Sequence, residues 1–187
     1  MTAAELLAIG AVVGLNNFAV ALMLGALGQR PRRWRIAGVF AVFEFTVPLI
    51  GLLAGAALAE TLSDAGRYAG AALLVALGAM AVRSAMGPKP GASSDRDRVA
   101  RQVTTWGGLV ALAAGLTADN LVVGFSLGLG DTEPLLLAGT IALFATTFTL
   151  IGIEIGAKGR RDLERAARLG SGLLLVALGL AIALGLI

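Results

Sequence analysis

Six apolar runs, each long enough to cross a lipid bilayer as a helix, take up nearly the whole chain. A spanning helix needs about 20 predominantly apolar residues. The runs cover 3–28, 36–59, 66–86, 104–129, 134–157 and 166–187 of the 187 residues. Charged residues make up 14% of the chain, whereas soluble domains carry about 25%. The sequence therefore predicts an all-α integral membrane protein with six transmembrane helices.

The second half of the chain repeats the first. Asn16 and Asn17, in GLNNFAVAL, correspond to Asp119 and Asn120, in TADNLVVGF, at an offset of 103 residues. The stretch FTVPLIGLLAG from Phe45 matches TTFTLIGIEIG at an offset of 101, and LLVALG occurs twice at the same offset. An internal repeat of this kind indicates duplicated structural units.

The repeat divides the chain into two three-helix units, at 1–86 and 104–187, joined by the polar segment 87–103. That segment is rich in Pro, Gly and Ser and is typical of a flexible linker. Because each unit has an odd number of helices, the second unit enters the membrane upside down relative to the first. We therefore expect two inverted three-helix repeats, the arrangement of many secondary transporters.

Basic residues lie almost entirely on one side of the predicted helices. Fourteen of the fifteen fall in the first, third and fifth links, and Arg67 is the exception. The positive-inside rule places those links, including the 87–103 linker, in the cytoplasm and both termini outside. The protein is then a multi-pass protein of the inner (plasma) membrane. The basic charge is explained by topology, so nucleic-acid binding is not predicted.

Two carboxylates lie at membrane depth. Asp119 is near the middle of the fourth run, and Glu44 is about two turns into the second. An acidic group near the bilayer centre costs at least about 2.5 kcal/mol and is functional by default. No Lys, Arg or His lies in the interior of a predicted helix, so each acid must be protonated or hold a cation. Asn16, Asn17 and Asn120 are candidate neutral oxygen ligands beside them.

Other polar residues have weaker claims to this site. Thr46 and Thr147 are repeat-related candidate supports, although they and Thr149 are equally suited to hydrogen bonds between helices. Glu154 lies near the cytoplasmic end of the fifth run, where it is either a ligand or a partner of Lys158 at i+4.

The chain has no Cys and no His, the residues that soft metals ordinarily recruit. Carboxylate, amide and hydroxyl oxygens instead suit hard cations such as Mn²⁺, Mg²⁺ or Ca²⁺. Pairs of glycines four residues apart recur in both halves, as in Gly51 and Gly55 or Gly152 and Gly156. They predict close helix packing and could equally serve a homodimer.

With these residues in view, the chain resembles the putative manganese efflux pump (MntP) family of the LysE transporter superfamily. The resemblance is carried by LNNFAVAL, by TADNLVVG and by FEFTVPLIGLLAG, which contains the E-x-x-x-P-L-I-G motif from Glu44 to Gly51. It implies that Glu44 and Asp119 take the acidic positions of the second and fourth helices. The acid of the first helix falls on Asn16, which keeps an oxygen ligand and loses the charge. The DN-type motifs are also similar to those of TerC-like metal transporters.

Together these features predict a secondary-active exporter of divalent metal cations, with Mn²⁺ as the leading substrate. Buried carboxylates can exchange a metal ion for protons, so we expect coupling to proton influx. The alternative is an exporter of a small organic solute such as an amino acid, which is disfavoured because the helix interiors offer no cation for an α-carboxylate. No enzymatic activity and no resident cofactor are expected.

Overall fold

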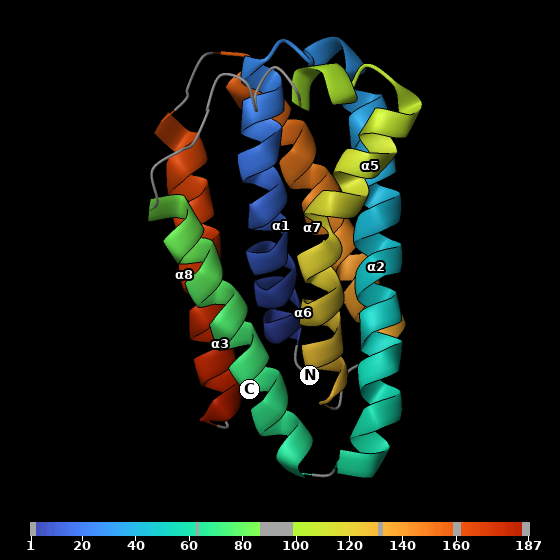
Figure 1. Ribbon diagram of the computed structural model, residues 1–187, viewed down its shortest axis with the longest axis vertical. Helices are drawn as coiled ribbons and strands as arrows, with labels where there is room; N and C mark the ends of the chain where they lie inside the picture. The colour runs from blue at the N-terminus through green and yellow to red at the C-terminus, as the bar shows by residue number, and fades with distance from the viewer. Residues whose placement is uncertain (1–2, 63, 87–98, 131–132, 159–161, 185–187) are drawn as a thin grey trace.

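The structure is a computed structural model that describes residues 3–62, 64–86, 99–130, 133–158 and 162–184. These residues form helices joined by short turns and contain no strand, which confirms the all-α prediction (Figure 1). The 87–103 linker prediction falls mainly on 87–98, outside the described residues. The elements are α1 (Ala3–Ala26), the short 3₁₀ helix η1 (Arg30–Arg32), α2 (Arg33–Leu62), α3 (Asp64–Met86), α5 (Trp106–Leu116), α6 (Ala118–Gly128), α7 (Pro134–Gly156) and α8 (Asp162–Ala183).

Four stretches of the described residues are long and apolar enough to cross a membrane: Ala3–Ala26, Arg30–Ala59, Trp106–Gly128 and Pro134–Gly156. The protein is therefore a multi-pass membrane protein. Within α3 and α8 the described apolar stretches are shorter, at Ala71–Met80 and Gly172–Ala181. A crossing by these two helices stays a prediction.

The fourth predicted run is confirmed as a candidate span at Trp106–Gly128, but it is interrupted once and is not one continuous helix. The chain is helical as α5, leaves helical geometry at Thr117 and resumes as α6. Thr117 has φ −97° and ψ 1°, in the sparsely populated bridge region. Its hydroxyl donates to Ala113 O at 2.9 Å, which satisfies one carbonyl at the end of α5. The break falls immediately before Asp119 and Asn120.

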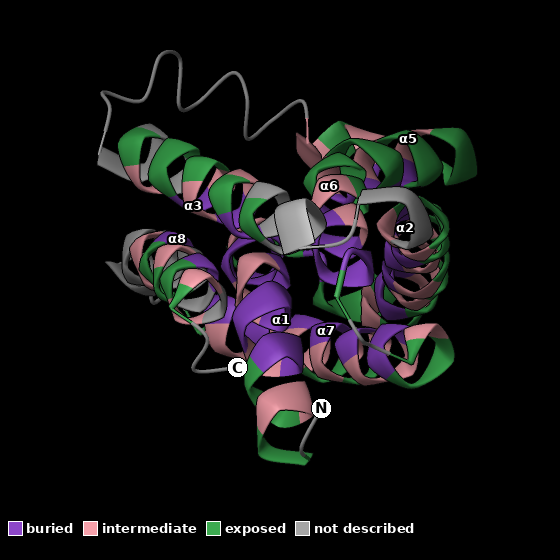
Figure 2. Cartoon of the chain, turned by 90° about the horizontal axis from the view of Figure 1, so that it is seen from below, coloured by how far each residue is buried: buried purple, intermediate pink, exposed green. Residues whose placement is uncertain are grey.

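The helices form a closed ring. α1 contacts α7 and α8, α2 contacts α7 and α6, and α3 closes the ring between α6 and α8. Figure 2 shows the ring from one end, with buried faces turned inward and much of α5 exposed on the outside. The ring brings the middles of α1, α2, α6 and α7 towards one another.

Glycines set the closest contacts in the ring. In the α2–α6 seam, a Cβ on Gly124 would clash with Pro48 O and one on Gly128 with Leu52 O. In the α1–α7 seam, a Cβ on Gly14 would lie 3.1 Å from Ala145 N, and one on Gly156 would clash with Leu22 O. Residue numbers rise together along both seams, so the paired helices run parallel. Small residues let helix backbones approach this closely.

Local signals fix the ends of several helices. Gly28, with φ +77°, follows α1 and supplies the left-handed conformation that ends many helices. Thr105 caps α5 by accepting a hydrogen bond from Gly108 N at 3.1 Å. The start of α5 is held to α2 by the Arg35 guanidinium, which lies 4.0 Å from the centre of the Trp106 ring.

Candidate functional site

Glu44 is the most deeply buried carboxylate among the described residues. It lies on α2 with no exposed surface. Its Oε2 accepts a hydrogen bond from Asn120 Nδ2 at 2.7 Å. Its Oε1 is buried and has no hydrogen-bond partner among the described residues. A buried carboxylate with an unpaired oxygen is costly unless a proton or a cation completes it.

The α2–α6 seam brings Glu44 and Asn120 together. Glu44 is one turn before Pro48, and Asn120 is one turn before Gly124, where the two backbones touch. Parallel helices in this register place the two side chains at the same level. Pro48 also lacks the N–H that would bond to the Glu44 carbonyl, so this backbone oxygen is left without its helical partner.

Asp119 lies in the first turn of α6, directly after the break at Thr117. Its side chain is exposed on the bundle, yet its charge lies close enough to Glu44 to repel it. The carboxylate sits beside the backbone N–H groups of Asp119 and Asn120. The first turn of a helix favours negative charge, so the helix that begins after the break stabilises the ionised form of this acid. The two carboxylates are electrostatic neighbours, and Glu44 is the more deeply buried of the two.

The two asparagines of α1 differ in burial. Asn17 is 2% exposed and lies beside the Glu44 carboxyl group. Its Nδ2 is buried without a hydrogen-bond partner among the described residues. Asn16 is partly exposed. The structure thus brings Asn17, Glu44 and Asn120 together from three helices and leaves Asn16 at the edge of the group.

Two of the predicted supports do not point into this group. Thr46 and Thr147 are exposed, and each hydroxyl donates to the carbonyl four residues earlier in its own helix, at 2.7 and 2.8 Å. Thr149 on α7 is the buried threonine instead, with no exposed surface. Sequence comparison of the halves favoured Thr147 because it aligns with Thr46. The better signal was spacing, since Ala145, Thr149 and Gly152 share one face of α7.

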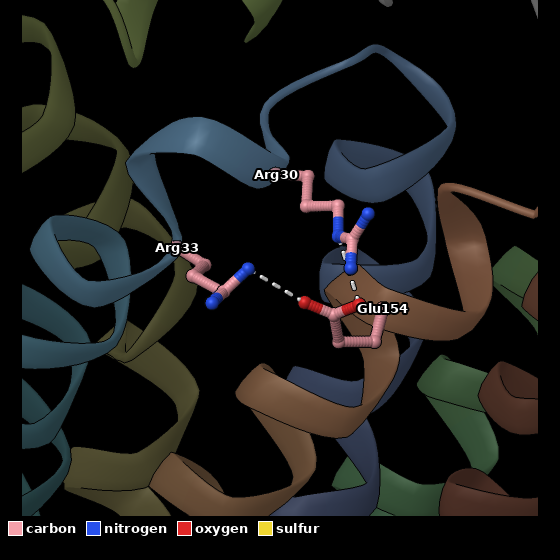
Figure 3. A network of polar contacts seen from close by, with 3 residues as sticks. All are labelled: Arg30, Arg33 and Glu154. Atoms are coloured by element: carbon pink, nitrogen blue, oxygen red, sulfur yellow. Dashed lines mark hydrogen bonds and ion pairs between the residues drawn. The ribbon is translucent and has the colours of Figure 1, made fainter.

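Glu154 takes part in a different cluster. Its two carboxylate oxygens lie 2.9 Å from Arg30 Nε and 2.9 Å from Arg33 Nη1 (Figure 3). The arginines come from η1 and the first residue of α2, so the cluster ties the connection between α1 and α2 to the end of α7. Among the described residues, Glu154 forms its ion pairs with these two arginines and not with the expected partner Lys158.

The donor set at Glu44 is oxygen-rich and low in charge. Within the described ranges there is no group of three or more His, Cys, Asp or Glu residues that could hold a metal ion. Two carboxylates, two buried amides and a freed backbone carbonyl remain. Asn120 uses its Nδ2 to orient Glu44, which leaves its Oδ1 available as a ligand. Such a set can bind a hard cation when the carboxylates are ionised.

Comparison with known proteins bears directly on this site. The family model described as Putative manganese efflux pump (Mntp) matches residues 28–183. This chain belongs to that family. The matched range contains Glu44, Asp119, Asn120 and Thr149, whereas Asn16 and Asn17 precede it.

Curated relatives of the family extend over α1 as well. Proteins named "Putative manganese efflux pump MntP" are 31% identical in Desulforamulus reducens and 32% identical in Pelotomaculum thermopropionicum. The first alignment covers 96% of this chain and 97% of the relative, and the second covers 94% and 95%. No solved structure matches this chain. The predicted family resemblance is confirmed over almost the full length.

Proposed function

We propose that this protein is a secondary-active exporter of divalent metal cations, with Mn²⁺ as its principal substrate. The observation that carries the proposal is Glu44, a fully buried carboxylate with one oxygen held by Asn120 and the other unpartnered among the described residues. Membership of the Mntp family supports the same substrate class, because the relatives are named as manganese efflux pumps. Those names also argue against an enzymatic role.

The ion is held by Glu44 and Asp119 as charged ligands and by Asn17 and Asn120 as amide ligands, with Asn16 at the edge. These are hard oxygen donors, which suit Mn²⁺ better than copper or zinc. Asp119 is exposed and Glu44 is buried. We infer that the ion meets Asp119 first and is then enclosed between Asp119 and Glu44.

Proton influx provides the return step. Glu44 has no Lys or Arg partner among the described residues, so in an apolar span its charge must be balanced by a proton or by the transported ion. When the metal leaves, protonation restores neutrality. Metal release to one side and proton uptake from it are thereby linked at a single carboxylate.

Two inverted three-helix repeats provide the framework for alternating access. The α1–α7 and α2–α6 seams are both parallel, as expected if a two-fold axis in the membrane plane exchanges the halves. In Figure 1 the C-terminal ends of α1, α3 and α7 lie towards one end of the bundle, and the first residues of α1 and the last residues of α8 lie towards the other. The basic residues that follow these three helices in the sequence favour a cytoplasmic position for that end, by the positive-inside rule, in a plasma membrane.

Purified protein in sealed vesicles tests the proposal. An imposed proton gradient is expected to drive Mn²⁺ transport, and metal addition is expected to move protons in the opposite direction. Glu44→Gln removes the buried charge with little change of shape and should abolish both fluxes. Labelled lysine and other amino acids serve as competing substrates. Amino-acid transport without Mn²⁺ transport would replace this proposal with an organic-solute exporter.

A control separates a functional loss from a folding loss. Thr46→Val alters a neighbouring exposed hydroxyl that bonds to its own helix and should leave transport intact. Full Mn²⁺ transport by correctly inserted Glu44→Gln would show that Glu44 is not the ion's ligand.

A further inference from the structure

The Thr149 hydroxyl lacks the hydrogen bond to its own helix that other hydroxyls in the described helices make. Six of them donate to the carbonyl of the residue four positions earlier, with oxygen–oxygen distances of 2.6–2.9 Å: Thr46, Thr117, Ser126, Thr140, Thr146 and Thr147. Thr149 Oγ1 is buried and has no hydrogen-bond partner among the described residues. A buried hydroxyl without a partner costs roughly 1–3 kcal/mol. The available bond to Ala145 O is not formed.

The packing of α7 places this hydroxyl at the level of Asn17. Gly14 of α1 faces Ala145, and Gly152 of α7 faces Phe18 and Ala21. Asn17 lies between the two contact points on α1, and Thr149 lies between them on α7. Both side chains are buried, so they occupy the same section of the α1–α7 seam.

Three buried polar atoms without partners then come from three different helices. They are Asn17 Nδ2 on α1, Glu44 Oε1 on α2 and Thr149 Oγ1 on α7. Asn17 connects the other two, because it lies beside the Glu44 carboxyl group and at the level of Thr149. Unpartnered polar atoms that cluster in this way are typical of a site completed by a ligand.

We propose that the Thr149 hydroxyl oxygen is a further ligand of the transported cation, supplied by α7. This inference rests on the proposed function, since it adds a residue to the same ion site. A hydroxyl is a neutral hard donor, so it supports Mn²⁺, Mg²⁺ or Ca²⁺ without adding charge. With this ligand α7 contacts the ion directly, so that ion binding draws α7 towards α1 and α2.

The first experiment compares Thr149→Val with Thr149→Ser and with Thr147→Val. Valine keeps the shape of threonine without its hydroxyl, and serine keeps the hydroxyl. Thr149→Val should weaken Mn²⁺ binding and raise the transport KM roughly tenfold, whereas Thr149→Ser and Thr147→Val should stay near wild type. The thermal midpoint of Thr149→Val should be equal to or above wild type, because an unpaired buried hydroxyl is removed.

A purely structural Thr149 gives a different pattern. Thr149→Val would then leave Mn²⁺ affinity unchanged, and this result overturns the inference while leaving the exporter intact. Loss of affinity in Thr149→Ser equal to that in Thr149→Val would likewise overturn it, since the hydroxyl would not be the cause. A wild-type protein that neither binds nor transports Mn²⁺ would instead contradict the proposed function.

A second measurement does not depend on manganese transport. The chain has no cysteine, so Thr149→Cys introduces a single thiol, and Thr147→Cys provides the matched control. Cd²⁺ bound by a thiolate gives an ultraviolet charge-transfer band. We expect the band in purified Thr149→Cys with Cd²⁺ and not in Thr147→Cys. Absence of the band in folded Thr149→Cys, or equal bands in both variants, would place Thr149 outside the ion site.

Discussion

The α2–α6 and α1–α7 seams have the same construction but different polar contents. Both join a helix of one half to a helix of the other through glycines that bring parallel backbones into contact. The α2–α6 seam carries Glu44 hydrogen-bonded to Asn120. In the α1–α7 seam the position 101 residues after Glu44 is Ala145, so Asn17, the mate of Asn120, has no repeat-related carboxylate in its own seam. The two seams therefore share an amide and differ in the buried carboxylate, which only the α2–α6 seam carries.

This difference explains why Asn17 Nδ2 has no partner among the described residues. Its mate Asn120 donates a hydrogen bond to Glu44 in the α2–α6 seam. The residue that corresponds to Glu44 in the α1–α7 seam is Ala145, whose side chain accepts no hydrogen bond. Asn17 lies instead beside Glu44 across the ring. A second buried carboxylate at position 145 would repel the first in the absence of a metal ion. One enclosed charge beside two amides can be neutralised by a single proton, which suits a site that must empty in every cycle.

The largest expected effect is on the KM for Mn²⁺, when the amide of each seam is replaced in turn. Asn120→Ala removes a ligand and also the donor that orients Glu44, so KM for Mn²⁺ should rise about 100-fold. Asn17→Ala removes an amide that lies beside Glu44 but does not hold its Oε2 as Asn120 does, and its KM should rise only about tenfold. Vesicle transport at varied Mn²⁺ concentration gives both values.

The order of these two effects tests the comparison. Equal losses in Asn120→Ala and Asn17→Ala would mean that the Asn120–Glu44 hydrogen bond contributes nothing beyond ligation. A larger loss in Asn17→Ala would move the centre of the site into the α1–α7 seam. Thr147→Val, which changes an outward-facing hydroxyl, is the control for expression and insertion.

The sequence was sufficient for the membrane class, the family and the buried group around Glu44. Apolar runs and the E-x-x-x-P-L-I-G motif depend on composition and local order, which a single sequence displays directly. The break at Thr117 was not predicted, because the length and mean hydropathy of the run 104–129 carry no information on the backbone angles of one residue within it. Thr117 satisfies Ala113 O with its own hydroxyl, and that bond is visible only in three dimensions.

The choice between Thr147 and Thr149 shows a second limit of sequence reasoning. Repeat alignment selects residues by ancestry, and it paired Thr147 with Thr46. Burial depends on which face of α7 meets α1, and Gly152 and Gly156 determine that face. Thr149 is three residues before Gly152 and lies on the same face, whereas Thr147 does not.

An intermediate effect, on the free energy of unfolding, is expected from replacing the corresponding glycine in each seam. A Cβ at Gly128 would clash with Leu52 O, and a Cβ at Gly156 would clash with Leu22 O. Gly128→Ala and Gly156→Ala should each lower the free energy of unfolding by roughly 1–3 kcal/mol, because overpacking forces the backbones apart. Thermal unfolding in detergent measures both. Gly115→Ala is the control, since no atom lies within 4 Å of a Cβ there. If only one of the two substitutions lowered the free energy of unfolding, only that seam would be too rigid to accommodate a methyl group.

The smallest effect is expected at the end of the α1–α7 seam, where the two seams again differ. Glu154 pairs with Arg30 and Arg33, whereas the repeat-related residue of α2 is Leu53. The three side chains are 34–58% exposed, and exposed ion pairs contribute about 0–1 kcal/mol. Glu154→Gln should therefore lower the free energy of unfolding only slightly and leave Mn²⁺ affinity near wild type. Salt should reduce even this difference, because exposed charges are screened. Equilibrium unfolding of wild type and Glu154→Gln at low and high salt, with Mn²⁺ binding measured on the same samples, checks both statements. A tenfold loss of Mn²⁺ affinity in Glu154→Gln would make Glu154 part of the ion's path, and the two seams would then differ in function at their ends as well as at their centres.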